Sequence, residues 1–180
     1  MAAIPNDILG FWRDAGPAKW FKHDSRFDEA IRLKFEPVHH AAARGQYDTW
    51  AATPDGALAL LILLDQFPRN LYRNSAHAFA TDGKARAVAR AAAAAGFHRL
   101  VEPELAQFFV LPFEHSEDLA DHDEARRLAA ELKDPNLDKW VELHRDIVAR
   151  FGRFPHRNPA LGRETTAEEQ AFLDEGGFSG

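Results

Sequence analysis

The feature that most constrains the fold is an uninterrupted apolar run, Ala57 to Leu64. Thr53 and Pro54 come before it and suit the cap and first position of a helix, where the missing N–H of proline costs nothing. A helix that is apolar around its whole circumference must be covered by protein on all sides. The run is also far shorter than the roughly 18 residues that a membrane-spanning helix needs. We therefore expect a central buried helix in a protein without a membrane span.

The other periodic segments are helical as well. Between Ser25 and Arg44 the apolar residues recur every three or four positions, which is the spacing of one helical face. Two further helices are predicted from about residue 117 to 133 and from 135 to 151, with Asp134 as the cap of the second.

The connections between these helices are short and rich in glycine and proline. Gly96 and Gly152 follow helical segments at positions that favour a left-handed residue, and Thr165-x-x-Glu168 has the pattern of a capping box before a terminal helix. We therefore expect an all-α fold in which antiparallel helix pairs stack in a tetratricopeptide-like array, as one domain over residues 1–180.

Composition excludes several classes of function. The chain has 180 residues, a net charge of -6 and no cysteine. Its basic residues alternate with acids instead of forming a patch, so we expect no nucleic-acid partner. A cysteine nucleophile and thiolate metal ligands are ruled out. The N-terminus lacks the pattern of a signal peptide, which favours a cytoplasmic protein.

Strongly polar side chains interrupt the apolar pattern first in the motif LDQFPRN. Its polar residues are Asp65, Gln66, Arg69 and Asn70. An ionised aspartate that follows eight apolar residues must be paired, and Arg69 is close enough in sequence to contribute. A buried ion pair that fixes the structure is the simpler interpretation of this motif by itself.

The second polar motif, EHSED, follows the apolar segment FFVLPF directly. It contains Glu114, His115, Ser116, Glu117 and Asp118. Two neighbouring carboxyl groups would raise the pKa of one of them, which is how a general acid is made. The alternative is that the acids merely begin a helix, where negative charge is favourable.

The third polar motif is RFGRFPHRN, residues 150–158. Its candidate side chains are those of Arg153, His156, Arg157 and Asn158. Glycine and proline stiffen this loop, so its donors are held in position. The guanidinium groups could bind an anion, or they could satisfy helix ends and the carboxylates of the other two motifs.

We predict that the three motifs meet. The helix that ends near residue 151 should run antiparallel to the helix that begins near residue 117, which returns the loop to the EHSED turn. Arg153, His156 and Arg157 should then lie beside Glu114, His115 and a buried Asp65. His144, by contrast, lies on an apolar stripe of this helix and is typical of a core histidine.

Together the motifs LDQFPRN, EHSED and RFGRFPHRN, followed by LGR and T-x-E-E, resemble the bacterial family called domain of unknown function 924. The resemblance covers nearly the whole chain from Trp20 onward, with a departure at Asp121-His122, where the family pattern favours glutamine. It implies a tetratricopeptide-like helical fold and implies no particular reaction.

No established catalytic or phosphate-binding motif is present. Asp65, Glu114, His115 and His156 offer oxygen and nitrogen atoms, but their spacing matches no known metal site, so we expect neither a metal nor another cofactor. Our main hypothesis is a protein that binds a small anionic or carboxylate-bearing molecule, with its status as an enzyme left open.

The alternative hypothesis is a tetratricopeptide-like interaction module that binds a peptide, with the polar motifs as a buried structural brace. Several exposed aromatic side chains around a groove would favour this alternative. The candidates for this test are Trp12, Trp20, Phe21 and Trp50, which the pattern more simply places in the core.

Overall fold

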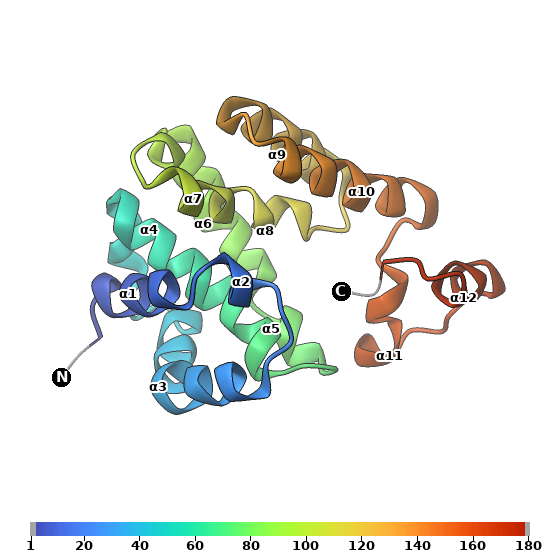
Figure 1. Ribbon diagram of the computed structural model, residues 1–180, viewed down its shortest axis with the longest axis horizontal. Coiled ribbons are helices and arrows are strands. Elements are labelled where there is room, and N and C mark those ends of the chain that lie inside the picture. The colour runs from blue at the N-terminus through green and yellow to red at the C-terminus, as the bar shows by residue number, and fades with distance from the viewer. Residues whose placement is uncertain (1–2, 179–180) are drawn as a thin grey trace.

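The computed structural model describes residues 3–178, and within that range the chain forms helices and turns without a β-strand (Figure 1). The all-α prediction is therefore confirmed for the described residues. The longer helices are α1 (Pro5–Ala15), α3 (Ser25–Ala43), α4 (Pro54–Leu61), α6 (Asp82–Ala94), α9 (Leu119–Leu132), α10 (Pro135–Phe151) and α12 (Ala167–Asp174).

Shorter elements connect these helices. The short α-helices are α2 (Pro17–Trp20), α5 (Phe67–Leu71), α7 (Pro103–Ala106), α8 (Leu111–Glu114) and α11 (Asn158–Leu161). The 3-10 helices are η1 (Asp48–Ala52), η3 (Ala76–Phe79), η4 (Phe97–Arg99), η5 (Gln107–Phe109) and η6 (Pro155–Arg157), and η2 (Ile62–Gln66) is a π-helix.

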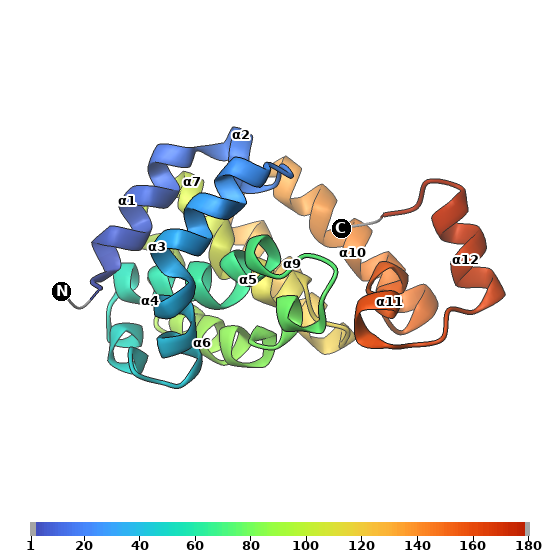
Figure 2. The same cartoon turned by 90° about the horizontal axis from the view of Figure 1, so that it is seen from below.

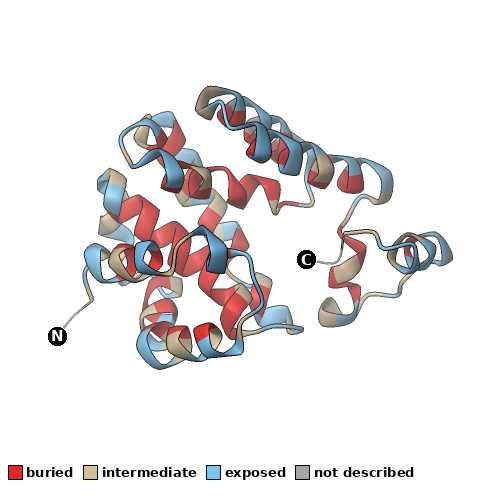
Figure 3. Cartoon of the chain, viewed as in Figure 1, coloured by how far each residue is buried: buried red, intermediate tan, exposed pale blue. Residues whose placement is uncertain are grey.

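The predicted central helix is formed by α4, η2 and α5, which run on from one another through the middle of the molecule (Figure 1). Thr53 caps its N-terminus by accepting a hydrogen bond from the backbone N–H of Gly56. Every residue from 56 to 68 is buried, and Figure 3 shows this core beneath the surrounding helices. Helices α1, α3 and α6 pack around it, as an all-apolar helix requires.

Pro68 accounts for the irregular geometry of the central helix. It has no backbone N–H for the carbonyl group of Leu64, and the N–H of Phe67 bonds to Ile62 instead of Leu63, so each leucine carbonyl lacks the donor that a regular helix would supply. Side chains replace it: Nδ1 of His39 lies 2.8 Å from the oxygen of Leu63, and the hydroxyl of Thr81 donates to Leu64 at 2.5 Å. The π-helical segment is thus stabilised from two neighbouring helical elements.

The antiparallel pair α9 and α10 begins and ends close to the predicted residues. Asp118 and Asp134 accept hydrogen bonds from the first turns of α9 and α10, and Gly152 ends α10 with a left-handed backbone, φ +71°. The capping box before α12 is one residue later than predicted, because Thr166 and Glu169 form it.

The C-terminal elements form a second, smaller apolar cluster at the end of α10. Its buried members are Ile147, Val148 and Phe154, and Phe151, Phe172 and Phe178 pack around them. The chain leaves α12 and turns back toward α10, as Figures 1 and 2 show. No helix within residues 3–178 has the length and apolar character needed to cross a membrane.

Two helical glycines provide a test of this packing. A Cβ at Gly56 would overlap the carbonyl oxygen of Trp50, whereas a Cβ at Gly10 would have no atom within 4 Å. We expect Gly56→Ala to lower the free energy of unfolding by about 1 to 3 kcal/mol through overpacking. Gly10→Ala should instead raise it by up to about 1 kcal/mol, because alanine favours the helix. Urea titration measures both changes, and stabilisation by Gly56→Ala would contradict the described packing.

Candidate functional site

The structure brings LDQFPRN and EHSED into direct contact through Asp65 and His115. These residues are 50 positions apart in sequence, yet Nδ1 of His115 lies 2.9 and 3.1 Å from the two carboxylate oxygens of Asp65. An ionised carboxylate only accepts hydrogen bonds, so Nδ1 carries the proton and donates it. Nε2 of His115 is then an unprotonated base, which makes no hydrogen bond within residues 3–178 and is not fully buried.

Asp65 is almost completely buried, at 1 % exposure, and is nevertheless ionised. Burial by itself would raise its pKa, but Arg69, His115 and Gln66 outweigh burial and hold the pKa well below its usual value. Arg69 lies 3.2 Å from the carboxylate, and Gln66 donates to it at 2.6 Å. The prediction of a buried Asp65 paired with an arginine is confirmed.

Glu114, at the end of α8, is a buried acid in its neutral form. Burial, together with the negative charge of Asp65, raises its pKa to about 8. Oε1 of Glu114 lies 3.0 Å from Nδ1 of His144, but burial lowers the pKa of His144 to about 3. Both groups are therefore uncharged at neutral pH, and their contact is not an ion pair.

The proton of Glu114 can be placed from its neighbours. Nδ1 of His144 donates its one proton to the carbonyl oxygen of Trp140 at 2.8 Å, so it cannot accept a proton from Oε1 of Glu114, 3.0 Å away. The carboxyl proton consequently belongs on Oε2, which is buried and has no hydrogen-bond partner within residues 3–178. Glu114 thus holds an acidic O–H group in the core, and it precedes the basic His115 in sequence.

Arg157 is the most unusual side chain of the third motif. It is only 6 % exposed, and its guanidinium lies between the rings of Phe79 and Phe154, 4.7 and 4.4 Å from their centroids. Its nearest carboxylate belongs to Asp82 at 4.0 Å, which is too far for a hydrogen bond. It makes no hydrogen bond with any described residue, and its Nε is fully buried.

The charge of Arg157 is retained at neutral pH. Burial, reinforced by the charge of Arg69, lowers its pKa only to about 10. Burial and the charges of Arg157 and Arg69 also lower the pKa of neighbouring His156 to about 4. Nδ1 of His156 is a further buried atom without a partner among the described residues. We call Asp65, Glu114, His115, His156 and Arg157 the polar cluster.

Arg153 lies outside the polar cluster, which corrects the predicted convergence. It donates to Glu169 of α12 at 2.6 and 2.8 Å and to the carbonyl oxygen of Glu164. Asn158 also donates to Glu169, at 3.2 Å. Arg153 and Arg157 are four positions apart, and the turn of η6, which ends at Arg157, directs the two guanidinium groups to different partners.

Two more candidates have structural partners away from the polar cluster. Glu117 accepts both guanidinium N–H groups of Arg163 at 2.8 Å and the backbone N–H of Phe154 at 3.0 Å. Asn70 donates to Asp28 of α3 at 2.8 Å. These contacts join separate segments of the chain and stabilise their packing.

Three residues beside the polar cluster were not among the candidates: His144, Asp82 and Phe79. Asp82 binds Arg69 through both carboxylate oxygens at 3.1 Å, although its sequence context indicated only the start of a helix. His144 resembled an ordinary core residue because its partner Glu114 is distant in sequence. No signal in the sequence pointed to Phe79.

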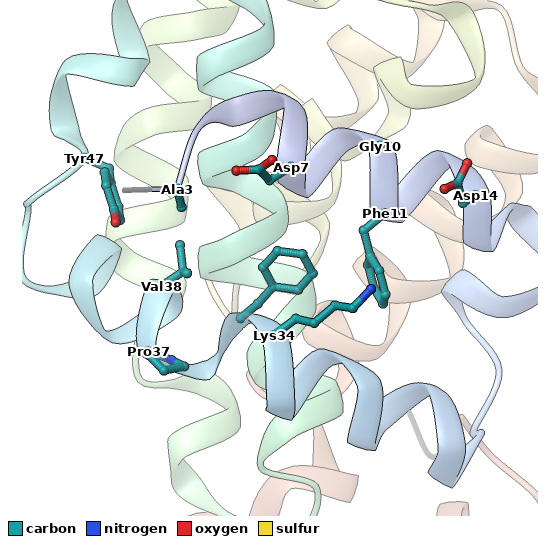
Figure 4. Close-up of a pocket in the computed structure, with 10 residues that line it drawn as sticks. Ala3, Asp7, Gly10, Phe11, Asp14, Lys34, Pro37, Val38 and Tyr47 are labelled. Carbon is teal, nitrogen blue, oxygen red and sulfur yellow. The ribbon is translucent and has the colours of Figure 1, made fainter. Parts of the chain in front are cut away.

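Two further features of the structure bear on possible ligands. Within residues 3–178, no group of three His, Asp or Glu side chains is arranged to bind a metal ion. A surface hollow of about 750 Å³ lies between α1 and α3, lined by residues that include Phe11, Lys34 and Tyr47 (Figure 4). None of the predicted site residues lines this hollow.

Removing the Asp65 carboxylate tests its role in the core. We expect Asp65→Ala to lower the free energy of unfolding by about 3 to 5 kcal/mol, since the partly buried Arg69 and His115 lose an acceptor in the core. The matched control is Glu142→Ala, whose partner Arg126 is half exposed, and it should cost less than about 1 kcal/mol. Equal losses in urea titration would contradict a special role for Asp65.

The protonation of Glu114 has a signature in the pH dependence of stability. Its pKa rises from 4.5 to about 8 on folding, so the folded protein keeps a proton that the unfolded chain loses in this range. Stability is therefore lost as the pH rises. Relative to Glu114→Gln, the free energy of unfolding should fall by about 1.4 kcal/mol per pH unit across this window. Parallel curves for the two proteins would show that Glu114 is ionised.

Comparison with known proteins agrees with the motifs. The model of the family described as bacterial protein of unknown function (DUF924) matches residues 8–177. A solved structure of a protein of unknown function, ATU0120 from Agrobacterium tumefaciens, is 47 % identical, with a TM-score of 0.92 over 95 % of this chain and 97 % of that chain. No protein with curated annotation matches. The chain belongs to the bacterial DUF924 family, whose function is unknown.

Proposed function

We propose that the protein is an enzyme that binds a small anionic molecule, most simply a carboxylate, next to Arg157 and transfers a proton on it. The observation that carries the proposal is the guanidinium of Arg157, which is charged and 6 % exposed but lacks hydrogen bonds to the described residues. Buried polar groups are normally satisfied. A planar carboxylate matches the paired donors of a guanidinium group.

The distribution of contacts among the charged groups also favours an added acceptor at Arg157. Asp65 and Asp82 both contact Arg69, whereas Arg157 has only the distant edge of Asp82. The contacts of the guanidinium group with the rings of Phe79 and Phe154 hold it without using its N–H groups. The side chain is thus held in place with its donors free.

His115 and Glu114 would supply the base and the acid. The contact with Asp65 holds His115 in the tautomer whose Nε2 accepts a proton, as in other carboxylate–histidine pairs. Glu114 is neutral in the same region and has a proton to give. Two groups whose surroundings separate their pKa values in this way are suited to acid–base catalysis.

The alternative function, a tetratricopeptide-like interaction module, has less support. Stacked antiparallel pairs such as α9 and α10 are compatible with such an array. However, Trp12 and Trp20 are buried and Trp50 is half-buried, which leaves Phe21 as the exposed member of the four aromatic candidates, at 62 %. Peptide-binding grooves rely on accessible apolar anchors.

Ligand titration tests the binding step. We expect one or more members of a panel of small carboxylates and inorganic phosphate to raise the melting temperature of the wild type, because a ligand that binds only the folded state stabilises it. Arg157→Lys should lose this stabilisation, and Arg150→Lys, which changes an exposed arginine, should keep it. A panel that stabilises no protein, or stabilises all three equally, would contradict binding at Arg157.

Proton transfer is tested separately with any ligand that binds. In D2O, proton NMR of the ligand should show deuterium incorporation or conversion with the wild type and none with His115→Gln, which retains a hydrogen-bonding side chain. If a ligand binds but is neither exchanged nor converted, the protein is a binding protein, and the proposed enzymatic activity is contradicted.

A further inference from the structure

The C-terminal segment Glu175–Phe178 is built to return to the polar cluster. Gly176 lies two residues beyond the end of α12 with φ +82°, and there the N–H of Gly176 bonds to the carbonyl oxygen of Leu173 and the N–H of Gly177 to that of Phe172. This pair of bonds is a Schellman motif, which reverses the chain. A Cβ at Gly177 would lie 2.5 Å from the carbonyl oxygen of Phe172, so only glycine fits the turn.

The turn places the ring of Phe178 against two histidines. The centroid of this ring is 4.5 Å from that of His144 and 5.2 Å from that of His156, and both contacts are edge-to-face. Nδ1 of His144 lies 3.0 Å from Oε1 of Glu114, and His156 precedes Arg157 in sequence. Phe178 therefore lies over the side of the polar cluster that holds its acid and its guanidinium group.

Few apolar contacts hold α12 in place. Glu169 is its only buried residue among those described, and this carboxylate is held by Arg153 and Asn158. Phe172 adds a half-buried contact with Phe151, at 5.1 Å between ring centroids. Segments with little apolar burial open at lower free energy than the core does. The polar contacts of the RFGRFPHRN loop hold α12 in place, and its small apolar burial allows the segment to open.

We propose that Glu175–Phe178 is a movable cover over the polar cluster and that Phe178 is the residue that closes it. Glu114 is 3 % exposed, so a ligand reaches it only if a covering group moves. The half-buried ring of Phe178 lies against His144, whose Nδ1 is 3.0 Å from Glu114, and a turn whose other residues are mostly exposed joins Phe178 to α12. The ligand that this cover would admit rests on the proposed function, whereas the cover itself is a property of the protein without a ligand.

Histidine acylation measures access to the cluster without any ligand. Diethyl pyrocarbonate modifies neutral imidazole nitrogens that it can reach, and peptide mass spectrometry gives a rate for each histidine. In the wild type, His144 and His156 should react more slowly than the exposed His23 and His77. Phe178→Ala should accelerate modification of His144 and His156 several-fold and leave the two exposed histidines unchanged.

Two further variants make the result specific. Gly177→Ala keeps the Phe178 ring but prevents the turn, so it should accelerate the same two histidines. Phe21→Ala removes an exposed ring that contacts Trp20 and Phe108 and should change neither rate. Far-UV circular dichroism verifies that each variant is folded.

Unchanged rates at His144 and His156 in both Phe178→Ala and Gly177→Ala would overturn the proposal, as would wild-type rates equal to those of His23. Because no ligand is present, this failure is distinct from a failure of the ligand titrations. A protein can bind an anion at Arg157 without a cover, and a cover can exist above a cluster that binds nothing.

Discussion

The ionised carboxylate of Asp65 is the interaction on which the polar cluster depends. A charge in an apolar core is costly unless donors compensate for it, and Arg69, Gln66 and His115 provide them. The same charge has two consequences for its neighbours. It fixes the proton of His115 on Nδ1, and it adds to the burial that keeps Glu114 protonated. One buried anion therefore sets the protonation of both groups that we propose as base and acid.

The backbone of the central helix is arranged to hold this anion. Without the change of register in η2 and the proline at position 68, the apolar run would continue as a regular helix with no need for side-chain donors. The interruption instead requires His39 and Thr81 to satisfy backbone carbonyl groups, and it places Asp65 at the centre of the fold. Such local irregularity within a stable core is typical of functional sites.

Local chemistry explains which features could be predicted from the sequence. The central helix, the caps at Thr53 and Asp134 and the end of α10 at Gly152 depend on residues within a few positions of one another. An ionised Asp65 in the apolar core needs partners that compensate for its burial. This requirement made the contact between the first two motifs predictable. The direction of a side chain in a tight loop has no such local signal. The sequence therefore could not show that Arg153 and Arg157 have different partners. The partnership of His144 with Glu114 and the return of Phe178 depend on tertiary packing, which periodicity does not reveal.

The most direct test of the account is the protonation state of His115 in the ligand-free protein. Nitrogen-15 NMR of the imidazole distinguishes protonated from unprotonated ring nitrogens. At neutral pH the account predicts a protonated Nδ1 and an unprotonated Nε2, because Asp65 accepts from Nδ1 and burial lowers the pKa of His115. A proton on Nε2, in either the neutral or the doubly protonated ring, would contradict the assignment of His115 as a base oriented by Asp65.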